Sequence, residues 1–375
     1  MTVLAPLSPP AQDLRVRSLP WDAVDRGRWE SILDACPDAG WFETPEWMGI
    51  LCRTFPDWRG RVLVAEDAGG RTLGILPFVI VRHFGVQTAL SMPFGTAGGP
   101  LIPGAGGFEP AEPRSPSRDN PEAVDDAAEV AGALCRSFLR EAAPWNSRGA
   151  QMIDLENRAL RALPPEARSP FRLESATRLV LDLAGGPEEV RARRFEPQRR
   201  RQARCADRRG LTVTAAEGES DFADFLKLYA AVSRTWHTRC RLPRDFFEEI
   251  RRSPSPRILL LVARHGGELV AGNLAFFYRQ SAVSWCGVMR KDLGDLHPSV
   301  ALHAETIARA CAAGCLTYDL GPSPALPRVE RFKRQFGAEP APYRSWTVLG
   351  PFGRVLERWR PALLRLPSPR GQVGE

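Results

Sequence analysis

The sequence of 375 residues is almost without lysine. Its 51 basic residues are all arginine except Lys227, Lys291 and Lys333, and the net charge is +7. No lysine follows the glycine-rich loop 93–100, which excludes a P-loop nucleotide site there. A moderate positive charge favours anionic partners, namely nucleotides, phosphorylated carriers, nucleic acid or acidic lipid, without choosing among them.

Long apolar runs and a secretory leader are also missing. The longest nearly apolar stretch, residues 73–81, is about half of the roughly 20 residues that a membrane-spanning helix needs. Residues 1–10 contain no basic region followed by an apolar run, so they do not resemble a signal peptide. We therefore expect a cytoplasmic protein with no transmembrane segment, which leaves contact with a membrane surface open.

The cysteines form no metal-binding pattern. None of the eight lies in a C-x-x-C pair, and Cys311 and Cys315 are four residues apart with no histidine or second pair nearby. Zinc sites need such pairs, so we predict reduced thiols and no metal.

The length predicts two domains, because single hydrophobic cores stop growing at roughly 250–300 residues. Residues rich in Pro, Gly, Ser and Arg predict disorder at 1–12, at 104–120 and in the last dozen residues. The sequence pattern places an N-terminal lobe at 13–184 and a C-terminal lobe at 185–350. A helix and tail follow at 351–375.

Both halves show the same order of elements. Each begins with two helices and continues as strand, Gly-Gly turn, strand, strand, loop, helix and strand. The expected segments are 29–36, 46–53, 61–66, 72–82, 86–92, 121–143 and 150–155 in the first half, and 221–235, 244–251, 257–264, 269–278, 282–289, 300–313 and 316–320 in the second. The pattern predicts an α/β fold with a mixed sheet in each half, and an internal duplication.

Four local motifs accompany this order: FETPEW at 42–47, RQAR at 201–204, the hairpin 267–272, and YDLG at 318–321 with RFKRQFG at 331–337. Together they resemble the GNAT acyltransferases, in particular the FemAB-like and BioF2-like branches, over about residues 20–350. The resemblance implies two tandem GNAT-like lobes, each a mixed β-sheet flanked by helices. The usual phosphate loop R/Q-x-x-G-x-G/A is absent, and RKDLGDLHPS stands in its place at 290–299.

The loop 290–299 is the expected donor site. It joins a strand to a helix, and a helix N-terminus attracts anions through its dipole and unpaired N–H groups. Arg290, Lys291, His297 and Ser299 would hold a pyrophosphate or a phosphopantetheine arm, with Ser299 capping the helix. The alternative is an ordinary capped helix behind a solvated basic loop.

Three residues are the expected catalytic groups. By the resemblance, Lys333 faces the acyl-transfer centre, where an ammonium stabilises an oxyanion or a donor phosphate. Asp319 accepts a proton from an amine, or instead binds an arginine as a strand-end carboxylate. His237 is the histidine best placed for acid–base chemistry. Trp236, Tyr318 and Phe332 complete the expected substrate site, although a tryptophan at a helix end also fits a core position.

The segment 187–209 is rich in arginine, and Arg201 and Arg204 would share one helix face. They are expected to bind a phosphorylated donor, or to form a solvated face. Near the end of the chain, residues 352–366 alternate apolar side chains with arginines at helical spacing. This segment fits an acidic membrane, although packing against the body of the protein is the favoured interpretation.

The predicted function is therefore acyl transfer from acyl-CoA or an acyl-carrier thioester to an amine of a small-molecule, sugar or peptide acceptor. One alternative is an aminoacyl-tRNA-dependent transferase of FemAB type, with tRNA as partner. The other is a non-catalytic GNAT-like scaffold in a polysaccharide or envelope pathway. An acyl carrier protein is a further expected partner, and DNA is not.

Overall fold

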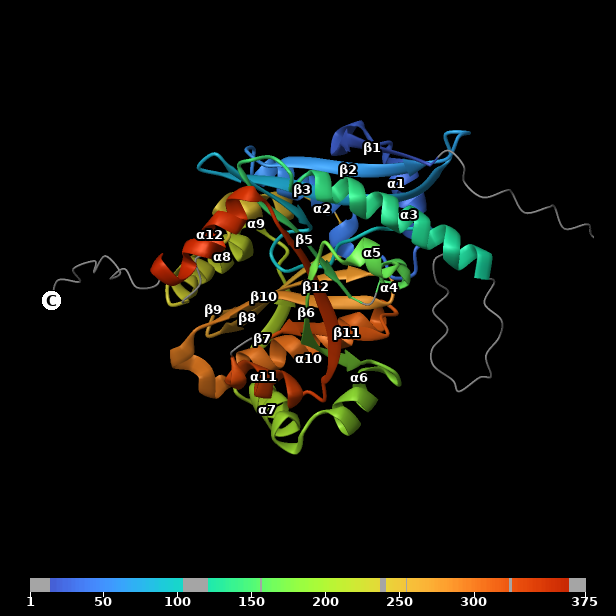
Figure 1. The fold of residues 1–375 in the computed structure, drawn as a ribbon. Helices are drawn as coiled ribbons and strands as arrows, with labels where there is room; N and C mark the ends of the chain where they lie inside the picture. The colour runs from blue at the N-terminus through green and yellow to red at the C-terminus, as the bar shows by residue number, and fades with distance from the viewer. Residues whose placement is uncertain are drawn as a thin grey trace, which may run out of the picture. The chain divides into compact units, whose positions relative to one another are not determined.

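The computed structural model describes residues 14–103, 121–155, 157–236, 241–253, 255–323 and 326–363. It divides into two compact units. Unit 1 consists of Met1–Ser175 and Arg344–Glu375, and unit 2 of Ala176–Tyr343. Figure 1 shows the elements of both in chain order. The three stretches expected to be disordered lie outside the described residues.

Unit 1 contains a mixed sheet with the strand order β1-β2-β3-β4-β5-β12. Neighbouring strands are antiparallel except β4 and β5, which are parallel. The strands are β1 Arg15–Pro20, β2 Arg59–Glu66, β3 Thr72–His83, β4 Val86–Ser91, β5 Ser147–Asp154 and β12 Glu339–Leu349. The helices are α1 Arg26–Ala35, α2 Pro45–Thr54, α3 Pro121–Arg140, α4 Arg158–Ala162, α5 Pro165–Arg168 and α12 Pro351–Leu363.

Unit 2 repeats the plan with the order β6-β11-β10-β9-β8-β7, in which only β10 and β11 are parallel. The strands are β6 Arg172–Asp182, β7 Thr212–Ala215, β8 Ile258–His265, β9 Glu268–Tyr278, β10 Ser281–Met289 and β11 Thr317–Pro322. The helices are α6 Gly186–Glu189, α7 Pro197–Arg208, α8 Glu219–Ser233, α9 Arg244–Arg252, α10 Pro298–Ala312 and α11 Pro327–Arg334. The expected α/β fold with a mixed sheet in each half is confirmed.

The boundaries between the two halves differ from the expected ones at strands β6 and β12. The sequence pattern puts boundaries at 184/185 and 350/351, whereas the compact units meet at 175/176 and 343/344. The reason is long-range strand pairing. Residues 344–349 of β12 pair with 149–154 of β5, and residues 178–182 of β6 pair with β11. Partners so distant in sequence leave no local signal.

The FETPEW motif is the start of helix α2. Thr44 is the N-cap, and its hydroxyl accepts a hydrogen bond from the Trp47 amide, while Pro45 occupies the first helical position. Both choices suit a helix N-terminus, because the hydroxyl satisfies an unpaired donor and proline has none to satisfy. Trp47 is fully buried, so the motif fixes the helix against the core of unit 1.

Close packing of α8 on the sheet of unit 2 depends on Gly272. A Cβ at this position would lie 2.5 Å from Cδ2 of Phe225, which projects from α8. Residue 272 therefore faces α8. Its neighbour Asn273 donates a hydrogen bond to Thr306 of α10, 3.2 Å away. Since successive residues of a strand point to opposite faces, α8 and α10 cover opposite faces of the sheet.

Glu43, in the FETPEW motif just before α2, has a buried carboxyl group. Only 4% of it is exposed, and its Oε2 accepts a hydrogen bond of 2.6 Å from the Gly40 amide. Burial raises the pKa of Glu43 to about 8, with a smaller contribution from Asp38. The folded protein therefore holds this side chain protonated at neutral pH.

We expect Glu43→Gln to stabilise unit 1 increasingly as pH rises from about 4.5 to 8. In this window the unfolded chain ionises Glu43 and the folded chain does not, so the wild type loses about 1.4 kcal/mol of unfolding free energy per pH unit from this group. The amide cannot ionise and still accepts the Gly40 N–H. Urea unfolding at several pH values measures the difference, with Glu174→Gln as an exposed control. A difference that does not change with pH would contradict the prediction.

Candidate functional site

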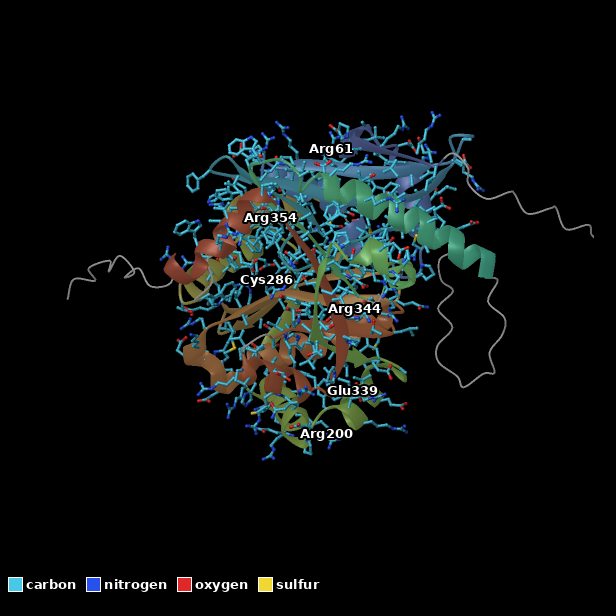
Figure 2. The ribbon with its side chains drawn as sticks, viewed as in Figure 1. Arg61, Arg200, Cys286, Glu339, Arg344 and Arg354 are labelled. Carbon is cyan, nitrogen blue, oxygen red and sulfur yellow. The ribbon has the colours of Figure 1, made fainter. Side chains whose placement is uncertain are left out.

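The parallel strands β10 and β11 part from each other at the centre of unit 2. Their pairing covers only Ser281–Val283 with Thr317–Asp319, although both strands continue. A bulge between Ser284 and Cys286 interrupts the pairing of β10 with β9 at the same level. Figure 2 labels Cys286 on this part of the strand. The divergence separates the two strands, and several expected site residues cluster around the end of β11.

Asp319 lies where β11 leaves its partner. It is buried, and Nη1 of Arg178 on β6 donates to its Oδ2 at 2.6 Å. Its Oδ1 accepts the Gly321 amide at 2.7 Å. Both oxygens therefore have a donor. The contacts match the alternative role of Asp319, a strand-end carboxylate that binds an arginine.

Lys333 lies on α11 and reaches back to the same strand end. Its Nζ donates to the carbonyl oxygens of Gly321 and Pro322, each at 3.0 Å. Burial lowers the pKa of Lys333 to about 8, against which the charge of Asp319 acts in the opposite sense. Gly321 has φ of +74°, a left-handed conformation that favours glycine, and this conformation presents its carbonyl to the ammonium.

A polar network lies behind this strand end. Tyr318 is fully buried, and its hydroxyl lies 2.8 Å from Nδ1 of His303 on α10. Burial raises the pKa of Tyr318 to about 12. It lowers the pKa of His303 to about 3, with help from the charges of Lys333 and Arg199. Both groups are therefore neutral at physiological pH. Ser284 and Asn273 also hydrogen-bond the Tyr318 side chain, and the Ser284 hydroxyl donates to the Asn273 side-chain oxygen at 3.0 Å.

Arg199 is the buried cation of the site. Its guanidinium lies 4.4 Å from the ring centroid of Phe332 and donates to Gln335 at 2.5 Å and to Gln202 at 2.6 Å. Burial lowers the pKa of Arg199. Phe332 also packs against His303, with 5.6 Å between centroids. Arg199, Phe332, His303 and Lys333 thus form one cationic, aromatic cluster between α7, α10 and α11.

The loop before α10 is less cationic than its sequence suggests. Residues Lys291–Leu296 form a short 3₁₀ helix. Arg290 is held by two carboxylates, Glu268 at 2.8 Å and Asp292 at 2.7 Å, while Lys291 is exposed. Desolvation and the nearby charges of Arg209 and Arg199 lower the pKa of His297. The positive charges that act on His297 are therefore those of Arg199 on α7 and of Arg209, which follows α7.

The expected capping role of Ser299 is wrong. The N-cap of α10 is His297, in a left-handed conformation with φ of 56°, and no side chain caps the helix. Pro298 takes the first helical position and Ser299 the second, so Ser299 lies two positions beyond the N-cap. Its hydroxyl instead donates to the sulfur of Met289 at 2.9 Å.

The remaining predicted residues lie apart from this cluster. Arg201 and Arg204 are exposed on α7 and make no ion pair among the described side chains. Trp236 follows the end of α8 and packs edge-on against Tyr229, with 5.7 Å between centroids. His237 lies outside the described residues. No cluster of three His, Cys, Asp or Glu side chains suited to a metal occurs in the described part of the chain.

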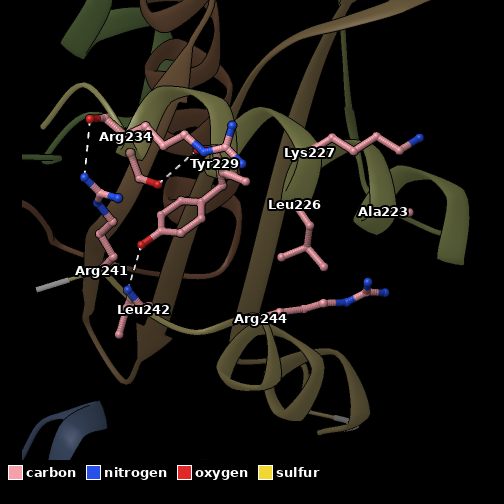
Figure 3. A pocket seen from close by; sticks show the side chains of 10 residues that line it. Ala223, Leu226, Lys227, Tyr229, Arg234, Arg241, Leu242 and Arg244 are labelled. Atoms are coloured by element: carbon pink, nitrogen blue, oxygen red, sulfur yellow. Dashed lines mark hydrogen bonds between the residues drawn. The ribbon is translucent and has the colours of Figure 1, made fainter. Parts of the chain in front are cut away.

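A separate pocket of about 510 Å³ lies along α8 (Figure 3). Its wall includes Leu226 and Tyr229, whose hydroxyl accepts the Leu242 amide at 2.9 Å. Four basic residues also line it: Lys227, Arg234, Arg241 and Arg244. It contains none of the predicted site residues.

Sequence reasoning missed two residues of the cluster, Arg199 and His303, and also missed Arg178, the partner of Asp319. For Arg199 the sequence holds a signal, because Arg199 follows the helical spacing of Ala203 and Ala206. In the structure all three residues are buried. For His303 no local signal exists, because its sequence neighbours Leu302 and Ala304 are apolar and also fit a core position. Nothing local distinguishes Arg178, whose partner Asp319 is 141 residues away.

Residues 192–334 match the family model of the acetyltransferase (GNAT) domain. Unit 2 is a GNAT domain. The matched range contains the parted strands, α10 and all of α11, so the cluster lies within the domain. The chain accordingly carries an acyltransferase domain. No curated protein matches the sequence.

Solved structures with a similar fold extend over nearly the whole chain. FemX is 12% identical, with a TM-score of 0.63, covering 91% of this chain and 99% of FemX. L-PGS from Bacillus licheniformis is 12% identical, with a TM-score of 0.51, covering 91% of this chain and 96% of L-PGS. At such identities the likeness concerns the fold alone, and it includes unit 1.

We expect Tyr318→Phe to lower the unfolding free energy of the GNAT domain by about 1–3 kcal/mol, because it leaves buried polar partners, including Nδ1 of His303, without the hydroxyl. Thermal unfolding measures the loss. Tyr343→Phe is the matched control, since the Tyr343 hydroxyl makes no hydrogen bond within the described residues. Equal melting temperatures for the two variants would contradict a structural role for the Tyr318 hydroxyl.

Proposed function

We propose that the GNAT domain transfers an acyl group from a thioester donor to an amine, by direct attack and without a covalent enzyme intermediate. The observation that carries the proposal is Lys333, a desolvated ammonium fixed at the end of β11 where the parallel strands part. The neutral amine attacks the thioester carbonyl, and the carbonyl oxygen becomes an oxyanion. The C–S bond then breaks as the carbonyl reforms, and the proton lost by the amine nitrogen passes to the departing thiolate, directly or through water.

Lys333 is the group that stabilises the oxyanion. An ammonium has three N–H donors, and the carbonyls of Gly321 and Pro322 accept two of them. The third is left for the developing negative charge. Because the two bonds hold the ammonium in place and burial removes competing water, it needs no reorganisation during the reaction.

Asp319 is a positioning residue in this proposal. With one oxygen bonded to Arg178 and the other to the Gly321 amide, it has no oxygen without a donor to accept a proton from the amine. It fixes the turn that presents the Gly321 carbonyl to Lys333. Its charge also keeps the pKa of Lys333 from falling further.

The donor is proposed to be acyl-CoA or an acyl-carrier thioester, with its phosphates near the start of α10. The support is electrostatic. Desolvation lowers the pKa of His297 most, and the charges of Arg209 and Arg199 lower it further, so both arginines act on this helix end. Arg209 is held there by a 2.5 Å bond to the Asp295 carbonyl. Arg201 and Arg204 supply further charge on α7, whereas Arg290 is already paired.

An aminoacyl-tRNA donor is the second candidate. The exposed arginines of α7, Arg201 and Arg204, suit a polyanion, and the fold likeness to FemX is compatible with it. The proposed acceptor, an amine of a small molecule, sugar or peptide, is common to both candidates. A non-catalytic scaffold would show no turnover with any donor.

We expect activity to fall above about pH 8 as Lys333 loses its proton, because a neutral amine no longer stabilises an oxyanion. Lys333→Ala should lower kcat by about 10²–10³-fold. In Lys333→Arg the side chain stays charged, so the fall above pH 8 should disappear even though kcat is reduced. Lys227→Arg is the control for a lysine outside the cluster.

Initial rates with acetyl-CoA, acyl-carrier and aminoacyl-tRNA donors test both the donor and this profile. A rate that rises through pH 8 in the wild type and falls in Lys333→Arg would make Lys333 a base and refute the oxyanion role. No turnover with any donor by the folded protein would refute the transferase.

We expect Asp319→Asn to shift the alkaline fall in kcat to lower pH, because removing the carboxylate charge removes the contribution that raises the pKa of Lys333. A general base at Asp319 would instead remove the acid side of the profile and leave the alkaline side in place. The kcat profile distinguishes the two. Glu330→Gln, on the exposed side of α11, is the matched charge control.

A further inference from the structure

Unit 1 exposes several large apolar side chains in one region. Phe84 is 92% exposed, Trp145 83% and Trp359 60%. Single exposed apolar residues are ordinary, whereas a group of large ones marks an interaction surface. None of these residues belongs to the GNAT domain or to the cluster around Lys333.

Phe84 is unfavourable at its position for two reasons, its strained backbone and its exposed ring. It is the first residue of the two-residue turn between β3 and β4, with φ of 48°, and Gly85 follows with φ of 77°. Such turns favour Asn, Asp or Gly, since a bulky side chain at positive φ is strained. The exposed ring has one ring contact among the described residues, a tilted one with His83 at 4.3 Å between centroids. The fold of unit 1 does not explain a phenylalanine here.

Trp145 lies beside this turn. Asn146 donates from Nδ2 to the Gly85 carbonyl at 2.8 Å, and the Gln87 amide donates to the Asn146 carbonyl at 3.1 Å. These two bonds join the loop before β5 to the β3–β4 turn. The two exposed rings therefore belong to adjacent loops at one end of the sheet.

Helix α12 begins at the same end and turns its apolar stripe outward. The Gly350 amide donates to the Arg148 carbonyl at 3.0 Å, and a Cβ at Gly353 would lie 2.0 Å from that carbonyl oxygen. The helix thus packs through Gly353. Its apolar stripe follows the spacing i, i+3, i+4 and i+7, and consists of Phe352, Val355, Leu356 and Trp359. Val355 is 52% exposed, so packing against the body of the protein does not cover the stripe.

The charged residues around these side chains are basic. Arg82, Arg148, Arg354 and Arg358 are all exposed, and Figure 2 labels Arg354 on α12. Arg82, Arg148 and Arg358 make no ion pair with any described side chain. The acidic residue of α12, Glu357, pairs at 3.4 Å with Arg172, which also pairs with Glu174 at 3.0 Å. The surface therefore combines aromatic and aliphatic side chains with unpaired positive charge.

We propose that Phe84, Trp145 and the apolar stripe of α12 dock the protein on an anionic lipid bilayer. Tryptophan and phenylalanine with arginine are the side chains that an interfacial helix places at the headgroup boundary. Valine and leucine on the stripe favour lipid over single-stranded nucleic acid, because aliphatic side chains cannot stack on bases. No helix in the described residues is long and apolar enough to cross the bilayer, so the contact is peripheral.

Co-sedimentation of the full chain with vesicles tests this docking surface. We expect binding to vesicles that contain phosphatidylglycerol and much weaker binding to phosphatidylcholine alone. Trp359→Ser and Phe84→Asn should each weaken binding about tenfold, and Arg148→Glu with Arg358→Glu more than tenfold, with strong dependence on salt. Asn suits the turn, so Phe84→Asn should leave the fold intact.

Leu316→Ser and Arg193→Glu, both exposed in unit 2, are the matched controls and should bind like the wild type. Three results would overturn the proposal: no binding of the folded chain to anionic vesicles, binding unchanged in the surface variants, or loss of RNA binding or of self-association in those variants without loss of vesicle binding. Acyl transfer to a water-soluble acceptor should be unchanged in the surface variants, so this test is independent of the proposed reaction.

Discussion

The site depends on one buried ion pair at the end of β11. Asp319 takes Arg178 on one oxygen and the Gly321 amide on the other, and this turn aims two carbonyls at Lys333. Breaking a buried pair leaves the remaining charge buried without a partner, which costs free energy. Such a pair therefore keeps its geometry. The desolvation that makes the pair costly also lowers the pKa of Lys333 to about 8. One constraint thus sets both the position and the acidity of the ammonium.

The surroundings of that ammonium follow from the sheet. Because β10 and β11 pair over only three positions and β10 then bulges, side chains from α7, α10 and α11 come together at the opening. Neutral Tyr318 and His303 form its polar floor, and Arg199 lies over the ring of Phe332. The cluster carries the positive charges of Arg199 and Lys333, which suit an anionic donor and a developing oxyanion.

Unit 1 has the same plan but a different surface. Its sheet and helices repeat those of the GNAT domain, yet no counterpart of Lys333 exists there, since all three lysines lie in unit 2. Its distinctive features are the protonated Glu43 in its interior and the exposed aromatic and arginine side chains at one end. Our two proposals accordingly assign acyl transfer to unit 2 and attachment to a bilayer to unit 1.

The sequence by itself determined the order of elements in both halves and the helix start at FETPEW, because these depend on local spacing. It also singled out Lys333 beside YDLG as a candidate, through the scarcity of lysine and the family resemblance. It did not determine which unit β6 and β12 belong to, the Arg178–Asp319 pair or the burial of Arg199. Each of these depends on contacts between residues far apart in the chain. Only the tertiary structure decided that Asp319 has no oxygen without a donor, that Arg290 is already paired, and that α12 packs through Gly353 with its apolar stripe outward. Local pattern predicts which face of a helix is apolar, whereas packing decides whether that face is covered.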